Sequence, residues 1–388
     1  MESKTAILYG EQTRLSLENM SFSGRMLSSY PEYVKALAQV KKSCAKANFK
    51  TDQLSQAKYE AISKACDEIV SGKYLEFFPV DVYHGGGNIA VNLNMNEVIF
   101  QLTENCCLVE EINFSQSTAD TCHTALYLTL SRELARLLKG MDQLIDTLKL
   151  KVEEFAHLQT VARTCYQDGM VVSVHHLFSG LISALSIERK SLIRLKGQFA
   201  LINLGFTVIG SGTGATDAYR SHILTCLEEV TTLRLQFVEN PYAVAQYPLD
   251  VVNLSVHVRN IAALLAKFAR DLRFLASGPE CGISEVMLPH VQKGSSFFKE
   301  KNNPVVPEMV VNCYLLISGN DSVIRESLSL GETYLNLQEG MMGFLLLDSL
   351  SMLVNAIKRF EEKCLKDLKI NRDRCKEFVH RIQKGGEK

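Results

Sequence analysis

The chain has 388 residues, of which 22 % are charged, and its formal net charge at neutral pH is −1. Lysine and arginine form no basic block, so the composition gives no indication of a nucleic-acid or membrane surface. No uninterrupted apolar run reaches the ~18 residues of a membrane-spanning helix, and we expect no leader in the first five residues. The 11 cysteines lack C-x-x-C spacing, which predicts reduced thiols in the core of a cytoplasmic protein and no metal ligation.

Helical periodicity dominates the sequence, which contains only eight prolines. Apolar residues first recur every three to four positions after Pro31, and stripes of the same period follow along most of the chain. Turns are predicted at 85–87 and around Asn105. Several successive helices, some longer than ~25 residues, predict a bundle, so the fold class is mainly α. The long helices are predicted over residues 124–159, 173–200, 222–237, 249–276, 304–316 and 341–368.

The first part of the chain differs from the rest because its predicted helices are shorter. We therefore predict a small N-terminal domain over 1–121 and a central long-helix bundle over 122–365. Residues 366–388 are predicted to begin a third helical segment that ends in a frayed tail.

The stretch 294–304, with the sequence GSSFFKEKNNP, is the most informative part of the chain. A loop of this composition can bring a hydroxyl, a fixed cation and an amide to one carboxylate. Serine acts as a base only where N–H groups and a cation stabilise its alkoxide, and Ser295 with Lys301 could meet that need. Taken singly, the two serines are typical of a solvated turn and Lys301 of a protein surface; the spacing of the combination makes it specific.

Three further segments carry polar groups near turns. Hydroxyls at a helix start bind carboxylates readily, so Ser117 and Thr118 in 115–120 (SQSTAD) are candidate ligands, although the same pattern is typical of a simple N-cap. Thr164 precedes Cys165, whose thiol we expect to be a buried small hydrophobe, with a reactive thiol as the alternative. The glycines of 78–99 permit close backbone approach, but no lysine follows them in the spacing of a phosphate-binding loop.

Together these segments resemble the aspartase/fumarase superfamily, and aspartases more than fumarases. The resemblance runs from residue 9 to about residue 374, but the chain lacks the PNDHVN segment and most of the family's C-terminal small domain. The matched patterns are GSSxMPxKxNP at 294–304, SQS[ST]ND at 115–120, RT[HQ]LQDA from 163, and FPVDVYQGGAGTSxNMNxNEV from 78.

The resemblance implies a cofactor-free lyase that eliminates ammonia or an amine from L-aspartate, or an aspartate-like substrate, to give fumarate. It implies homotetramers whose active sites combine the segments of Ser117, Thr164 and Ser295 from three subunits. Ser295 would be the base, and an enediolate would be the intermediate. One substrate carboxylate would be held by Thr164, Lys301 and Asn303, and the carboxylate that becomes the enediolate by Ser117, Thr118 and Ser296.

Several positions depart from the family pattern. Ala119 replaces an asparagine that binds substrate, and Cys165 replaces a histidine or glutamine that helps to hold the amino group. Ile89 and Ala90 replace a Thr-Ser pair, so two donors near the carboxylate are missing. Lys299 and the residue after it replace proline and a small residue. Three interpretations stay open: an aspartase, a lyase with another leaving group on a larger amino-acid-derived substrate, and a non-catalytic structural homologue.

Overall fold

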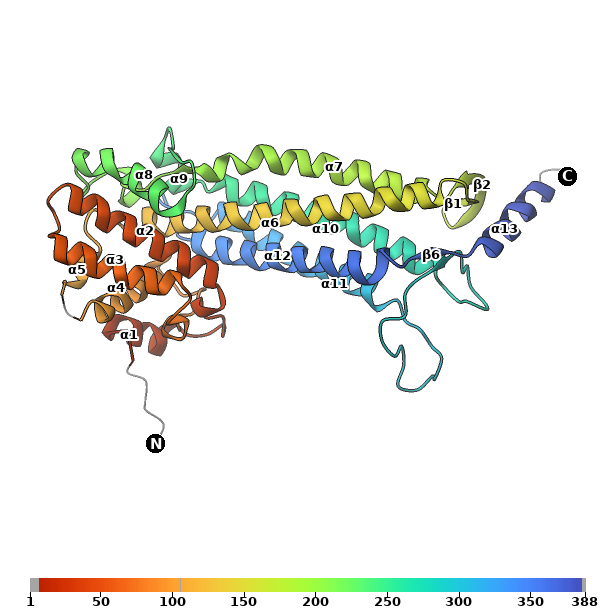
Figure 1. Ribbon diagram of the computed structural model, residues 1–388, viewed down its shortest axis with the longest axis horizontal. Coiled ribbons are helices and arrows are strands. Elements are labelled where there is room, and N and C mark those ends of the chain that lie inside the picture. Colours follow the sequence, from red (N-terminus) through yellow and green to blue (C-terminus); the bar gives the residue numbers. More distant parts are fainter. Residues whose placement is uncertain (1–6, 105, 386–388) are drawn as a thin grey trace. The chain divides into compact units, whose positions relative to one another are not determined.

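The computed structural model describes residues 7–104 and 106–385 (Figure 1). Within those residues it contains thirteen α-helices and three two-stranded sheets, so the prediction of a mainly α fold is confirmed. The centre of the turn expected around Asn105, the expected frayed end at 386–388 and the first five residues lie outside the described residues.

The helices before residue 118 are short or of moderate length, as the sequence predicts. They are α1 (Glu11–Met20), α2 (Pro31–Lys50), α3 (Gln56–Val70), α4 (Ile89–Leu102) and α5 (Val109–Ile112).

Most of the later helices are longer. They are α6 (Thr118–Phe155), α7 (His176–Lys196), α8 (Asp217–Thr231), α9 (Pro241–Gln246), α10 (Leu249–Leu275), α11 (Val305–Leu328), α12 (Glu339–Phe360) and α13 (Arg372–Gly385). Local sequence signals determine where several of these helices begin. Pro31 and Pro241 stand in the first turn of α2 and α9, where proline's missing N–H costs nothing. The Thr216 hydroxyl accepts from the N–H of Tyr219 and caps α8.

The sequence analysis did not predict the strands. β1 (Gln159–Thr164) and β2 (Gln167–Ser173) form an antiparallel hairpin in which Thr164 pairs with Gln167. The two loop residues, Cys165 and Tyr166, both have positive φ angles (51° and 60°), as in the tight turns that suit hairpin twist. The other two sheets are two-residue pairings: β3 (Leu201–Ile202) with β4 (Gln236–Phe237), and β5 (Val286–Met287) with β6 (Lys369–Ile370).

The chain divides into two compact units, each assembled from separate pieces of sequence. Unit 1 takes the described parts of 1–133, 195–253 and 322–347. Unit 2 takes those of 134–194, 254–321 and 348–388. The predicted division into three domains, with boundaries at 121 and 365, stays a prediction. The long helices contribute residues to both of the compact units.

Aromatic contacts mark the core of each unit. In unit 1 the Phe344 ring is 1 % exposed, and its centroid lies 4.8 Å from that of Tyr30 and 5.0 Å from that of Tyr33. In unit 2 the Phe268 ring lies 5.7 Å from Phe178 and 6.2 Å from Phe360. These contacts join α2 to α12 in unit 1, and α7, α10 and α12 in unit 2.

Two helical stretches are long and apolar enough to cross a membrane by length and composition alone. They are Leu249–Leu275 and Glu339–Leu365, and 50 % and 61 % of their apolar windows are buried inside the structure. Core helices of water-soluble proteins meet the same criteria. Because Phe268 and Phe360 belong to these stretches and pack against each other, core packing accounts for this apolar character.

Phe344→Ala should lower the free energy of unfolding by about 3–5 kcal/mol, because it empties a buried site that two tyrosine rings cannot refill. Phe22→Ala is the matched control in the same unit. The Phe22 side chain is 75 % exposed, and its loss should change stability by less than about 0.5 kcal/mol. Urea unfolding measures both variants, and equal losses would contradict the assignment of Phe344 to the core.

Candidate active site

The first candidate segment lies where α6 begins, in unit 1. Ser117 immediately precedes the helix, Thr118 is its first residue, and both side chains are half-buried. The Ser117 hydroxyl donates to Oδ1 of Asp120 at 3.1 Å, and Thr118 Oγ1 accepts from Asn92 Nδ2 at 3.3 Å. Both hydroxyls are thus held by neighbouring side chains at the positive end of a long helix, where an anion is favoured.

The Asp120 carboxylate fixes the geometry of this segment. Its Oδ1 also accepts from the N–H of Ser117 at 2.8 Å, and its Oδ2 accepts from the N–H groups of Gly205 and Thr207 at 2.9 and 3.1 Å. Burial raises the pKa of the Asp120 carboxyl above its ordinary value, against the opposing effect of these hydrogen bonds. The glycine-rich turn after residue 204 therefore holds the start of α6.

A second buried network lies behind Thr118. Asn113 Oδ1 accepts from Lys41 Nζ at 3.0 Å and from the side-chain amides of Asn92 and Asn96, each at 3.2 Å. Burial lowers the pKa of Lys41 to about 8. Because Asn92 also donates to Thr118, this network couples a buried cation to a candidate carboxylate ligand.

The glycine-containing segment leads into α4. Ile89 is the first residue of that helix and is 51 % exposed, whereas Ala90 is buried. Neither side chain has a polar group to offer a ligand. Further along α4, the Glu97 carboxylate accepts from the N–H groups of Gln12 and Thr13 at 2.8 and 3.0 Å, so the segment anchors α1.

Thr164 is exposed at the end of β1, in unit 2. The prediction that Cys165 is a buried small hydrophobe is wrong, because this residue lies exposed in the two-residue turn of the hairpin. A tight turn places its side chains in solvent, and the sequence analysis had not recognised the turn. The strand is anchored by Arg163, whose Nη1 lies 2.6 Å from Oε2 of the buried Glu285.

The loop that carries Ser295 also belongs to unit 2. Ser295 Oγ accepts from the N–H groups of Phe297 and Phe298 at 3.1 and 3.0 Å. Asn303 Nδ2 donates to the carbonyl oxygen of Gly294 at 2.6 Å and so joins the two ends of the loop. A Cβ at Gly294 would lie 1.9 Å from the carbonyl oxygen of Lys301, so only glycine fits there.

These contacts would stabilise an alkoxide at Ser295. Two N–H groups already point at its oxygen, and an alkoxide accepts stronger hydrogen bonds than a neutral hydroxyl does. Ser296 is exposed beside it. Lys301 is exposed, and its ammonium lies 5.9 Å from the centre of the Phe298 ring.

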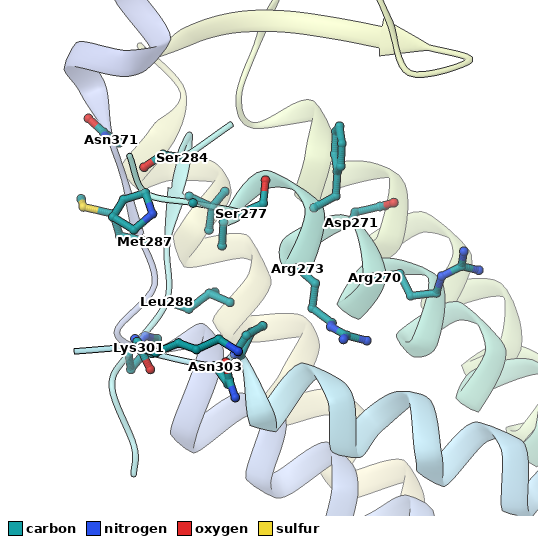
Figure 2. A pocket seen from close by; sticks show the side chains of 18 of the residues that line it. Arg270, Asp271, Arg273, Ser277, Ser284, Met287, Leu288, Lys301, Asn303 and Asn371 are labelled. Carbon is teal, nitrogen blue, oxygen red and sulfur yellow. The ribbon is translucent and has the colours of Figure 1, made fainter. Parts of the chain in front are cut away.

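A cavity of about 1110 Å³ lies next to this loop, and all of its lining residues belong to unit 2 (Figure 2). Lys301 and Asn303 line it, together with the C-terminal part of α10, the segment that follows α10 and Asn371. Tyr166, from the turn after Thr164, lines the same cavity and packs on Phe274 at 5.2 Å. The hairpin tip and the base of the loop thus border one space.

The structure groups some of the predicted site residues and separates others by unit. Ser295, Ser296, Lys301 and Asn303 share one loop, and Thr164 belongs to the same unit. Ser117 and Thr118 belong to the other unit. Their assembly into one active site stays a prediction. Among the described residues, no group of three or more His, Cys, Asp or Glu side chains could hold a metal ion.

Sequence reasoning missed several residues that hold these segments. Asp120 ends the SQSTAD segment, but its buried contacts could not be read from the motif. Asn113 gave no signal, because an asparagine in a turn is common. Lys41 lies on an apolar helix face, and a lysine at such a position was the one available signal.

Comparisons with known proteins place the chain among lyases. A family model described as Lyase matches residues 1–319. Aspartate ammonia-lyase of Helicobacter pylori (strain J99) is 33 % identical over 390 residues, covering 98 % of this chain and 83 % of the relative. Aspartate ammonia-lyase of Escherichia coli (strain K12) is 31 % identical, covering 96 % and 80 %.

Solved structures are similar over the same extent. A fumarate lyase:delta crystallin from Brucella melitensis has a TM-score of 0.92 at 33 % identity, covering 96 % of this chain and 84 % of that one. A class II fumarase from Schistosoma mansoni has a TM-score of 0.93 at 28 % identity, covering 97 % and 84 %.

Asp120→Asn should destabilise the protein by about 1–3 kcal/mol at pH 5, because an amide cannot accept from N–H groups on both sides. The difference in unfolding free energy between the wild type and Asp120→Asn should narrow towards pH 8. The folded-state pKa of Asp120 is raised, so the stabilisation from its bound proton is complete below the ordinary pKa and is lost as pH rises through the raised value. Only the wild type shows this pH dependence of stability, because the variant lacks the Asp120 carboxyl group.

Urea unfolding at the two pH values measures the effect. Asp52→Asn is the control, since Asp52 is exposed in the same unit and its backbone conformation also suits asparagine. A difference in unfolding free energy that widens with pH would show that the hydrogen-bond donors outweigh burial and lower the folded-state pKa of Asp120.

Proposed function

The chain belongs to the aspartase/fumarase superfamily of lyases, and on that basis we propose that it eliminates ammonia, or an amine, from L-aspartate or an aspartate-like substrate to give fumarate. Members of this family act on small dicarboxylate or amino-acid substrates. The observation that carries the proposal is the pair of N–H groups directed at Ser295 Oγ, at the serine that the family pattern assigns as base.

In the proposed reaction, the Ser295 alkoxide takes a proton from the carbon next to one carboxylate. The electron pair of that C–H bond moves into the carboxylate to give an enediolate, which the hydroxyls of Ser117, Thr118 and Ser296 stabilise. The pair then returns to form the carbon–carbon double bond, and the C–N bond breaks to release ammonia or the amine. Lys301, Asn303 and Thr164 hold the other carboxylate throughout.

The residues assigned to these roles belong to both units, and the proposal therefore includes an assembly of subunits that brings them into one active site. We propose a cytoplasmic homotetramer in which each site combines the Ser117, Thr164 and Ser295 segments of three subunits. Exposed apolar side chains on α11, Leu315 at 60 % and Leu316 at 59 %, support a role for that helix in subunit contacts.

A lyase with another leaving group is the second candidate, and the amine side of the site favours it. Ala119, half-buried in the first turn of α6, has no polar side-chain atom, and the Cys165 thiol is a weak hydrogen-bond partner. A small ammonium group would find few hydrogen-bond partners there, whereas a substituted amine needs fewer such partners. Ultraviolet absorbance at equal concentrations of L-aspartate, L-malate and N-substituted aspartates tests both candidates, and no product from any of them would favour a non-catalytic homologue.

Ser295→Ala should reduce turnover on the accepted substrate by roughly 10²–10⁴-fold, the usual cost of removing an essential base. Folding should be unaffected, because the side chain is half-buried in a surface loop. Ser329→Ala is the control at an exposed serine outside the loop and should keep full activity. The rate of fumarate formation measures both, and an active Ser295→Ala enzyme would exclude Ser295 as the base.

The triple variant Ile89→Thr, Ala119→Asn and Cys165→His separates the candidate functions. Each restored hydrogen bond contributes about 0.5–1.5 kcal/mol, so kcat/KM for L-aspartate should rise by roughly one to three decades in a weakened aspartase. A lyase adapted to another substrate should lose activity on that substrate instead. A wild type as fast as an ordinary aspartase would show that these three positions do not limit the reaction.

A further inference from the structure

The cavity beside α10 contains more positive charge than its own carboxylates balance. Its lining includes two acids, Asp271 and Glu300, and four cations. The cations are Lys267, Arg270, Arg273 and Lys301. Only one of them is closely neutralised within the lining, since Lys267 Nζ lies 2.6 Å from Oδ2 of Asp271. The remaining charges favour an anionic ligand.

Two of these cations lie near the same end of the cavity. Figure 2 shows the Lys301 ammonium directed towards the side of the cavity where the Arg273 guanidinium lies, whereas Arg270 points away from both. The Arg273 side chain is 39 % exposed, and its Nη2 lies 3.9 Å from the Glu308 carboxylate, the outer limit of an ion pair. Like charges gathered at one end of a cavity repel each other, and an anion bound there would relieve that repulsion.

The surroundings of this pair also suit a carboxylate. Arginine presents a planar fork of N–H groups that binds both oxygens of one carboxylate, and lysine supplies a point charge. Asn303 lines the same space and precedes α11 by two residues, so the positive end of a 24-residue helix begins beside it (Figure 2). Four kinds of donor therefore border one part of the cavity: a guanidinium, an ammonium, an amide and a helix start.

We propose that Arg273 is a substrate-binding residue that holds, together with Lys301, the carboxylate opposite the reacting one. The family pattern assigned Lys301 and Asn303 to this carboxylate but gave no role to Arg273. With two cations for a single carboxylate, the site selects doubly charged C4 acids over their monocarboxylate and amide analogues. The identity of the ligand rests on the proposed function; the anion site itself rests on the cavity.

Succinate is the probe, because it has both carboxylates and no leaving group, so its binding does not depend on turnover. Isothermal titration calorimetry of the full-length protein should show that Arg273→Leu weakens succinate binding by roughly 10- to 100-fold, the loss expected for one charge-assisted contact. Arg273→Lys should recover a measurable part of that loss. Arg194→Leu, the matched control at an exposed arginine of the same unit outside the cavity lining, should bind succinate within about twofold of wild type. Butyrate, with one carboxylate, should bind weakly to every variant.

Glu308→Gln separates ligand binding from a structural role. If Arg273 only braces α11 through Glu308, this variant should weaken succinate binding as much as Arg273→Leu does. If Arg273 binds the ligand, removing its weak internal competitor should leave affinity unchanged or raise it. Unchanged succinate affinity in Arg273→Leu, equal losses in Glu308→Gln, or a wild type that does not bind succinate would each overturn the proposal.

The outcomes also distinguish this proposal from the proposed function. Succinate binding that requires Arg273, in a protein that forms no product from any aspartate, would support the anion site and reject the lyase activity. Elimination that requires Ser295, with the same KM and the same succinate affinity in Arg273→Leu as in the wild type, would support the lyase activity and reject the anion site. A melting temperature for each variant confirms that the folded protein was titrated.

Discussion

The buried Asp120 carboxylate is the interaction that holds the candidate site residues of unit 1 in place. Its two oxygens accept from two separate pieces of chain, the residue before α6 and the turn at Gly205–Thr207. A buried carboxylate without such donors would be too costly to keep, so the donors and the charge require one another. The consequence for function is positional, since the Ser117 hydroxyl points where Asp120 holds it and Thr118 follows in the first turn of a 38-residue helix.

In unit 2 the candidate base, Ser295, lies on an exposed loop. Such a loop has no packed core to orient a side chain, so local hydrogen bonds must do it. The two N–H groups on Ser295 Oγ and the bond that closes the loop from Asn303 to Gly294 serve that purpose. The same N–H groups would stabilise the serine alkoxide, so orientation and activation come from one set of contacts.

The sequence predicted the long helices well, because their apolar stripes have the period of a helix and their starts carry proline or hydroxyl signals. It predicted α11 to end near 316, but the helix continues to Leu328. Asp321, which is typical of a turn, is instead buried and accepts from Ser255 and Arg259 across the bundle. The hairpin was missed for a related reason: its turn is Cys165–Tyr166, which lacks the Asn-Gly or Asp-Gly signal of a tight turn. In both places a tertiary or turn requirement outweighed local preference.

The departures from the family pattern fall unevenly over the candidate site. On one side, most of the groups that would hold carboxylates and remove the proton are present: the hydroxyls at the start of α6, Ser295 with its N–H donors, and Lys301 with Asn303 at a cationic cavity. The exception is the Thr-Ser pair of the family, which Ile89 and Ala90 replace. On the other side, Ala119 and Cys165 give the amino group little to bind. Loss of catalysis by drift would not be expected to spare the base and its donors, since a substitution at the base is as accessible as one at the amine pocket. The uneven distribution therefore favours a change in leaving group over a loss of the reaction.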